Sequence, residues 1–224
     1  MHFLKRKRQG KVGAAALKID MSKAYDRIEW AFLEAVLLRL RFNAKWVTLI
    51  MLCVSTVRYH VIQDGKEVGP IVPNRGLRQG DPLSPHLFIL CAEGLSALIH
   101  KNERAGLIHG VRVAREAPVV SHLFFANDCF LFFKANQSEA RLVKRILGVY
   151  GHRSGQMVNF NKSSIYFSLN VKEDVKEHIC HILEVNATIN HGTYLGLPSL
   201  IGRNKKEVSI LFEIGCGRSF TVGV

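Results

Sequence analysis

The chain has 224 residues, of which 48% are hydrophobic, so it can bury a core, and its length suits one domain or one and a half. Its 31 Lys and Arg residues exceed its 18 acidic residues, which gives a formal charge of +13. This excess favours a polyanionic partner, such as nucleic acid or an anionic membrane face, and the composition argues against a disordered chain.

The cysteines and the apolar segments narrow the class of protein further. The five cysteines lie far apart and form no CxxC pair, which argues against a disulfide framework or a structural zinc site and indicates a reducing compartment. His178, Cys180 and His181 lack the paired spacing of a zinc site and are better explained as ordinary helix residues. The apolar run 46–57 is too short to cross a bilayer, and the basic segment 1–11 is no secretory signal. We therefore expect an intracellular protein of the nucleus or cytoplasm, without a membrane partner.

The first half of the chain predicts a strand, two helices and a hairpin. In chain order they are the strand AAALKID (14–20), the helices 28–40 and 44–56, and the hairpin strands RYHVIQ (58–63) and KEVGPIVP (66–73). Asp20 ends the strand, and Asp26 is placed to cap the first helix. Asp64 and Gly65 suit the tight turn of the hairpin.

The second half predicts a further alternation of strands and helices. The elements are a loop at 74–85, a helix from Pro85 to Lys101 capped by Ser84, a strand LIHGVRV (107–113), two strands around Asn127 and Asp128 in LFFANDCFLFF (123–133), a helix 138–154, a strand SSIYFS (163–168), a helix 172–185 and a short extended piece TYLGLP (193–198). This order indicates an α+β fold in which helices cover one side of a sheet.

Two carboxylates are candidates for a metal site. Asp20 ends one predicted strand and Asp128 lies at the tip of a predicted hairpin, so the two can meet at one edge of the sheet. Magnesium prefers oxygen ligands and usually takes one or two carboxylates plus substrate phosphates. The pattern alone does not decide the matter, because an Asp at a strand end or in a turn is common.

Five segments form a series along the chain. They are KVGAAALKIDMSKAYDRIEW (11–30), GLRQGDPLSPHLF (76–88), LFFANDCFLF (123–132), SGQMVNFNKSSIYFS (154–168) and YLGLPSLIG (194–202). In this order they resemble the motifs of reverse transcriptases from LINE-type, non-LTR retrotransposons, especially those of plants. The resemblance implies a polymerase palm, which is an antiparallel sheet backed by helices, with partial fingers and the start of a thumb from about residue 190. We expect an N-terminally truncated reverse transcriptase domain at 1–213 and an atypical tail at 214–224.

The resemblance also implies a role for each matching residue. Asp20, the backbone carbonyl of Met21 and Asp128 match the groups that bind two magnesium ions. Tyr25 matches the aromatic ring that lies under the incoming sugar and leaves no room for a 2′-hydroxyl. Lys162 matches a lysine that neutralises or protonates the leaving pyrophosphate.

The partners implied are an RNA template, a DNA primer and deoxynucleoside triphosphates. Gln79 and Gly80 match the loop that contacts the incoming nucleotide and the template, where glycine allows close approach of the backbone. Basic residues are expected to grip a phosphate backbone, and these are Lys5, Arg6, Lys7, Arg8, Lys11 and Arg78. For the N-terminal ones, a solvated or nuclear-targeting basic run is an equal alternative.

The third motif departs from the family at one position. The family's usual core is Phe-Ala-Asp-Asp, and here Asn127 stands at the first Asp position of the catalytic set. An amide oxygen can coordinate magnesium but brings no negative charge. At about 4 Å and an effective dielectric of about 20, one lost charge is worth roughly 4 kcal/mol per unit of metal charge. A loss of that size in the transition state lowers the rate about a thousandfold.

We therefore expect the two-metal nucleotidyl transfer of an RNA-directed DNA polymerase, impaired by Asn127 and by truncation. Two alternatives stay open. The chain is a non-catalytic remnant that binds nucleic acid through its basic surface, or it does not fold stably because the missing parts leave palm surface exposed.

Overall fold

The computed structural model describes residues 12–114, 116–125, 128–188, 193–194 and 197–198, together with single residues of the N-terminal segment, namely Leu4, Lys7, Arg8 and Gly10. The predictions for Lys5, Arg6, Lys11, Asn127 and the tail 214–224 lie outside the described residues. Among the residues that are described, no helix has the length and apolar character needed to span a membrane.

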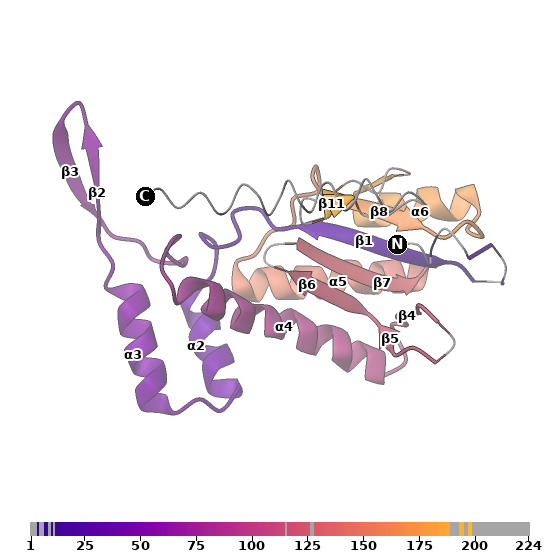
Figure 1. Ribbon diagram of the computed structural model, residues 1–224, viewed down its shortest axis with the longest axis horizontal. Coiled ribbons are helices and arrows are strands. Elements are labelled where there is room, and N and C mark those ends of the chain that lie inside the picture. Colours follow the sequence, from indigo (N-terminus) through magenta and orange to yellow (C-terminus); the bar gives the residue numbers. More distant parts are fainter. Residues whose placement is uncertain are drawn as a thin grey trace, which may run out of the picture.

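A five-stranded sheet in the order β6-β7-β1-β8-β9 forms the centre of the fold (Figure 1). Its strands are β1 (Ala14–Asp20), β6 (His122–Phe125), β7 (Asp128–Lys134), β8 (Ser164–Phe167) and β9 (Asn186–Ala187). β1 pairs antiparallel with both β7 and β8, whereas β8 and β9 are parallel. The predicted antiparallel sheet is confirmed, and the strand that ends on Asp20 lies at its centre.

Three helices cover one face of this sheet, as predicted. They are α4 (Ser84–Arg104), α5 (Gln137–Ser154) and α6 (Glu173–Leu183). Because side chains alternate along a strand, Leu17 and Ile19 of β1 are buried in the main core beneath these helices. Ala16 of β1 faces the other way and packs in a smaller cluster with Phe130 and Tyr166. The polar residues of β1 therefore lie on the face that the helices leave open.

Two helices and a hairpin extend from one end of this body (Figure 1). They are α2 (Trp30–Arg39), α3 (Ala44–Ser55), β2 (Tyr59–Gln63) and β3 (Lys66–Ile71). The hairpin turn falls on Asp64 and Gly65, whose φ angles of 51° and 73° are the positive values that a two-residue turn of this kind requires. Every residue of both strands is exposed, so the predicted hairpin projects away from the core.

The first predicted helix begins later than expected. It starts at Trp30 with Glu29 as its N-cap residue, so the predicted capping role of Asp26 is wrong. The Asp26 carboxylate instead accepts a hydrogen bond of 3.2 Å from Nε2 of Gln79. The segment before the helix is thus used for a contact between distant loops, which local sequence preferences do not reveal.

The predicted cap of the long helix is also wrong. Ser84 is the first residue of α4, and Leu83 occupies the N-cap position. No side chain among the described residues caps this end; the Oδ1 of Asp81 accepts a hydrogen bond of 2.8 Å from the amide of Leu83 itself, just before the helix.

Two predicted extended segments are shorter than expected. The strand predicted at 107–113 is reduced to β4 (Val111–Arg112), which pairs with β5 (Val119–Val120) in a separate two-stranded sheet. The extended piece at 193–198 contains two short antiparallel strands, β10 (Thr193–Tyr194) and β11 (Leu197–Pro198). Neither segment joins the central sheet.

Candidate active site

Asp20 and Asp128 are directly opposite each other on the antiparallel strands β1 and β7. Residues in such a position have Cβ atoms about 4.5–5.5 Å apart, and two like charges there destabilise the pair. Both residues lie on the open face of the sheet and are partly exposed. The sheet register thus brings together the two carboxylates that the sequence predicts, in a place that favours a bound cation.

Lys18 is a residue of this site that sequence reasoning missed. Its Nζ lies 3.6 Å from Oδ1 of Asp128, and the two side chains are 22% and 27% exposed. Lys18 is two positions before Asp20, so strand alternation alone places it on the same face. A cation at Asp128 must therefore compete with an ammonium group that the chain itself supplies.

The donor set fits a divalent cation bound mainly by substrate. Asp20 and Asp128 offer two carboxylates on an accessible face, and magnesium usually takes one or two carboxylates and completes its shell with water and phosphate oxygens. Within the described part of the chain, no three His, Cys, Asp or Glu residues converge as a metal cluster. Asn127, the predicted third member of the catalytic group, lies outside the described residues.

The loop at 154–163, which connects α5 to β8, holds the segment that follows Asp20. Five hydrogen bonds run between the two segments: Ser163 Oγ accepts from the Asp20 amide (3.2 Å), the Asn159 amide donates to the Asp20 carbonyl (2.8 Å), the Ser22 amide donates to the Met157 carbonyl (2.8 Å), Gln156 Nε2 donates to the Ala24 carbonyl (2.7 Å) and the Glu29 amide donates to the Ser154 carbonyl (3.0 Å). Met21 also forms a β-bridge with Val158. The fourth sequence motif therefore positions the backbone of the first.

Tyr25 lies at the junction of this segment with the loop at 76–81. Its ring stacks on Phe88 of α4, with centroids 4.9 Å apart and planes inclined by 15°. Its carbonyl accepts a hydrogen bond of 2.9 Å from the Leu77 amide, and the neighbouring Asp26 accepts one from Gln79. The structure thus brings the predicted sugar-contacting residue next to the predicted nucleotide-contacting loop.

The loop at 76–81 borders a cavity of about 430 Å³ between α3, the hairpin and the start of α4. Arg78 and Gln79 line this cavity, and both are exposed. Gly80 has a φ of 85°, a left-handed conformation that favours glycine, although no atom lies within 4 Å of the place a Cβ would take. The backbone conformation therefore favours glycine here, and the space beside it is open.

The remaining predicted residues are less closely tied to the carboxylates. Lys162 is exposed on the turn before β8, one residue from Ser163, whose hydroxyl bonds the Asp20 amide. Lys7 is half-buried and Arg8 is exposed in the N-terminal segment. Cys129, the neighbour of Asp128, is buried, and this burial raises the pKa of its thiol well above the ordinary value, which argues against a nucleophilic role.

Comparison with known proteins assigns a family to this arrangement. A sequence model described as reverse transcriptase (RNA-dependent DNA polymerase) matches residues 2–207, which is most of the chain. The chain belongs to the reverse transcriptase family. The resemblance predicted from the five motifs is therefore confirmed.

Relatives of the chain include a transposon protein. The chain is 51% identical over 67 residues to an uncharacterised mitochondrial protein of Arabidopsis thaliana, covering 30% of the chain and 55% of that protein. It is 26% identical over 177 residues to the Transposon TX1 uncharacterized 149 kDa protein of Xenopus laevis, covering 78% of the chain and 13% of that protein. The chain thus spans less than two thirds of the length of either relative.

Two solved telomerase structures from Candida tropicalis share the fold. An apo telomerase truncated from its C-terminal domain has a TM-score of 0.52 at 16% identity, covering 72% of this chain and 32% of the telomerase. A telomerase in complex with the TWJ fragment of telomeric RNA has a TM-score of 0.55 at 16% identity, covering 88% of this chain and 30% of the telomerase. At this identity the likeness shows the fold alone, and it confirms the predicted α+β polymerase fold.

Proposed function

We propose that the chain is the RNA-directed DNA polymerase domain of a LINE-type, non-LTR retrotransposon. The observation that supports this proposal most directly is the position of Asp20 opposite Asp128 on the open face of the sheet. The two residues come from separate motifs more than a hundred positions apart. A polymerase active site needs two carboxylates close together. A pair of strands with a structural role alone has no need for them.

The proposed reaction joins a deoxynucleotide to a primer. The primer 3′-hydroxyl attacks the α-phosphate of a deoxynucleoside triphosphate, so that a new O–P bond forms while the bond to the β-phosphate breaks. The hydroxyl proton passes to solvent and pyrophosphate leaves. In this scheme the exposed ammonium group of Lys162 neutralises charge on the leaving pyrophosphate.

Asp20, Asp128 and the backbone carbonyl of Met21 would hold magnesium. All three groups supply oxygen, and the two carboxylates are opposite each other and accessible. When bound, magnesium supplies positive charge that stabilises the attacking and leaving oxygens. The ion pair of Lys18 with Asp128 partly offsets carboxylate repulsion until then.

Residues of the neighbouring loops would select the nucleotide. Tyr25 is rigidly placed by its stack on Phe88 and by its backbone bond to Leu77, so its ring can exclude a 2′-hydroxyl. Gln79 and Gly80 would contact the nucleotide and template beside it. The exposed guanidinium of Arg78 would bind template phosphate.

The proposed reaction is impaired, because Asn127 brings no charge where the family has a carboxylate. The second candidate function is a remnant that binds nucleic acid without catalysis. The 3.6 Å contact between Lys18 and Asp128 favours this candidate, since it places a cation of the chain next to the carboxylate that magnesium needs.

Primer extension on an RNA template separates the two functions. We expect slow magnesium-dependent extension by the unaltered chain, a rise of up to about a thousandfold in Asn127→Asp, and no extension in Asp128→Asn. Equal rates for the unaltered chain and Asn127→Asp would show that the site is not impaired. Salt-dependent template binding without extension by any variant would support the remnant instead.

A further inference from the structure

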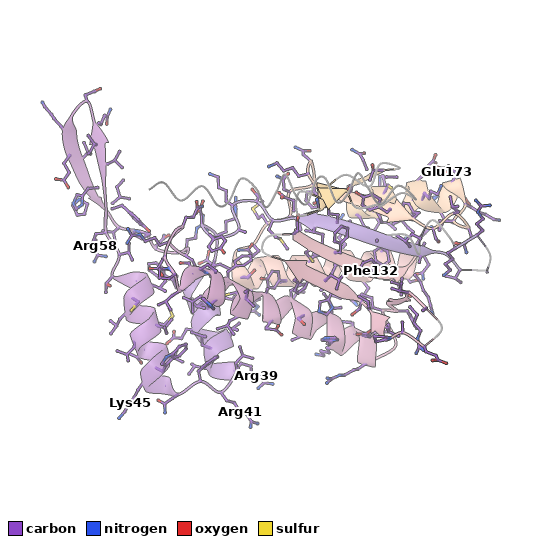
Figure 2. All side chains as sticks on the ribbon, viewed as in Figure 1. Arg39, Arg41, Lys45, Arg58, Phe132 and Glu173 are labelled. Carbon is purple, nitrogen blue, oxygen red and sulfur yellow. The ribbon has the colours of Figure 1, made fainter. Side chains whose placement is uncertain are left out.

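The turn between α2 and α3 gathers basic and aromatic side chains at the surface. These side chains, which we call the 39–46 patch, are Arg39, Arg41, Phe42, Lys45 and Trp46, and all five are exposed. Figure 2 shows Arg39, Arg41 and Lys45 at the end of the helical pair that lies away from the β2–β3 hairpin. None of the residues proposed for polymerase chemistry belongs to this turn.

The patch lies in an uninterrupted basic region. Residues 35–63 contain four Lys or Arg residues and no Asp or Glu. No carboxylate among the described residues forms an ion pair with Arg39, Arg41 or Lys45. The positive charges of this turn are therefore not neutralised by ion pairs, and they attract a polyanion.

The backbone of the turn holds Arg41 in an unfavourable conformation. The Arg41 amide donates to the Leu38 carbonyl (3.0 Å) and the Phe42 amide to the Leu37 carbonyl (3.2 Å), which is the Schellman pattern of a helix end. The residue at this position is usually glycine, because its φ is positive, and here Arg41 has a φ of 65°. A residue kept in an unfavourable conformation points to a role for its side chain.

The two aromatic rings form a platform outside the core. Phe42 and Trp46 stack with centroids 4.8 Å apart and planes inclined by 19°. They are 37% and 39% exposed, and neither is among the buried residues of the main core cluster. Exposed stacked rings beside unpaired cations are the combination that holds bases and phosphates of single-stranded nucleic acid.

We propose that the 39–46 patch binds a stretch of single-stranded polynucleotide, separately from the polymerase site. The cations contact phosphates and the Phe42–Trp46 platform stacks with one or two bases. A protein partner would instead use the apolar surface of α3, where Leu49 and Leu52 are exposed. The absence of acids in residues 35–63 and the three unpaired cations favour the polynucleotide.

Trp46 provides a local probe for the test. The chain has two tryptophans, and the indole of the other, Trp30, bonds the Gly76 carbonyl at 2.8 Å. Titration of the full chain with oligouridylate or oligothymidylate of about ten nucleotides is expected to quench tryptophan fluorescence. In Trp46→Phe, which keeps a ring but removes the indole, the quenching is expected to disappear. Quenching that persists in Trp46→Phe would place the bases elsewhere and overturn the proposal.

Charge variants test the phosphate contacts. The patch variant combines Arg39→Gln, Arg41→Gly and Lys45→Gln, and the matched control combines Lys101→Gln, Arg104→Gln and Arg145→Gln, three exposed cations on α4 and α5. Three lost phosphate contacts reduce the slope of log affinity against log salt by about 2 and weaken low-salt binding at least tenfold. The control is expected to change affinity less than twofold. Equal losses in both variants would show general charge attraction and overturn the proposal.

Arg41→Gly alone separates binding from folding. Glycine relieves the positive φ, so the variant is expected to keep or gain thermal stability while its affinity falls. Crosslinking with a 4-thiouridine oligonucleotide is expected to mark residues 39–46, and failure to mark them would overturn the proposal. Tighter binding of oligouridylate than of oligothymidylate would identify RNA as the ligand of the patch. Equal binding of the two oligomers would show that the patch accepts RNA and DNA alike.

The test does not depend on polymerase activity. The same titrations in Asp20→Asn are expected to give unchanged quenching, so a chain inactive in primer extension still reports on the patch. Self-association that Leu49→Lys abolishes, together with a flat oligonucleotide titration, would assign the surface to a protein contact and overturn the proposal.

Discussion

Gln156 Nε2 donates a hydrogen bond of 2.7 Å to the carbonyl of Ala24, which lies 132 residues earlier in the chain. Gln156 is only 3% exposed, so this bond forms in the interior. It fixes the turn between Asp20 and Tyr25 from the side of the 154–163 loop. The geometry of the proposed nucleotide site therefore depends on a side chain that touches neither metal nor nucleotide.

Gln156→Met is expected to destabilise the chain by about 1 kcal/mol, because methionine fills a similar volume but leaves the buried Ala24 carbonyl unpaired. The loss is smaller than the full cost of an unpaired carbonyl, since the substitution also removes the buried Oε1 of Gln156, which has no partner among the described residues. Urea unfolding measures this loss. Gln137→Met, at an exposed position at the start of α5, is the control and is expected to stay within about 0.5 kcal/mol of the parent chain. Equal stability of the two variants would contradict a structural role for the bond.

Two glycines near the end of α5 are expected to respond in opposite directions to alanine. Gly155 has a φ of 78°, and a Cβ there would clash with the Arg27 carbonyl oxygen. Gly155→Ala therefore costs about 1–3 kcal/mol from conformation alone, and the clash adds to it. Gly148, within the helix, has nothing within 4 Å of the place a Cβ would take, so Gly148→Ala is expected to gain roughly 0.5–1 kcal/mol. Thermal unfolding measures both changes in stability. A Gly155→Ala variant as stable as the parent chain would contradict the close contact with the Arg27 carbonyl.

Local patterns and motifs predicted much of the fold and the main pair of the site. Strand β1 and the β2–β3 hairpin follow from apolar runs and a turn dipeptide, and Asp20 and Asp128 from their motifs. What escaped prediction depends on contacts between distant segments. Lys18 meets Asp128 only because of the register of β1 with β7, and Gln156 reaches Ala24 only once the fourth motif packs on the first.

Alkaline pH is expected to destabilise the chain through Cys91. Burial raises the pKa of its thiol from 9.0 to about 12, so between these values the unfolded chain releases a proton that the folded chain retains. Stability from this group is complete below pH 9 and is lost as the pH rises towards 12. Urea unfolding between pH 8 and pH 10 measures how steeply the free energy of unfolding falls as the pH rises.

Two cysteine variants test whether the Cys91 thiol causes this loss of stability at alkaline pH. Cys91→Ala is expected to remove part of the loss of stability above pH 9, because the buried thiol of Cys129, whose pKa burial also raises, contributes to the same loss. The variant is less stable at every pH because it leaves a small cavity. Cys53 is exposed, and Cys53→Ala is expected to keep the slope of the parent chain. An unchanged slope in Cys91→Ala would show that another group titrates.

Lys18→Gln is expected to strengthen binding of a divalent cation at the Asp20–Asp128 pair. The Lys18 ammonium lies 3.6 Å from Asp128 Oδ1 and offsets part of the charge that would attract the metal. Because both side chains are partly exposed, the pair is worth at most about 1 kcal/mol, which corresponds to a gain of up to about fivefold in affinity.

Manganese is a suitable probe, since the loss of its free-ion paramagnetic resonance signal reports binding without nucleotide. Lys45→Gln removes the same charge from an exposed position on α3 and is expected to leave the affinity unchanged. In an Asp128→Asn background the effect of Lys18→Gln is expected to vanish, and weaker manganese binding in Lys18→Gln alone would mean that the lysine supports the site and does not compete with the metal.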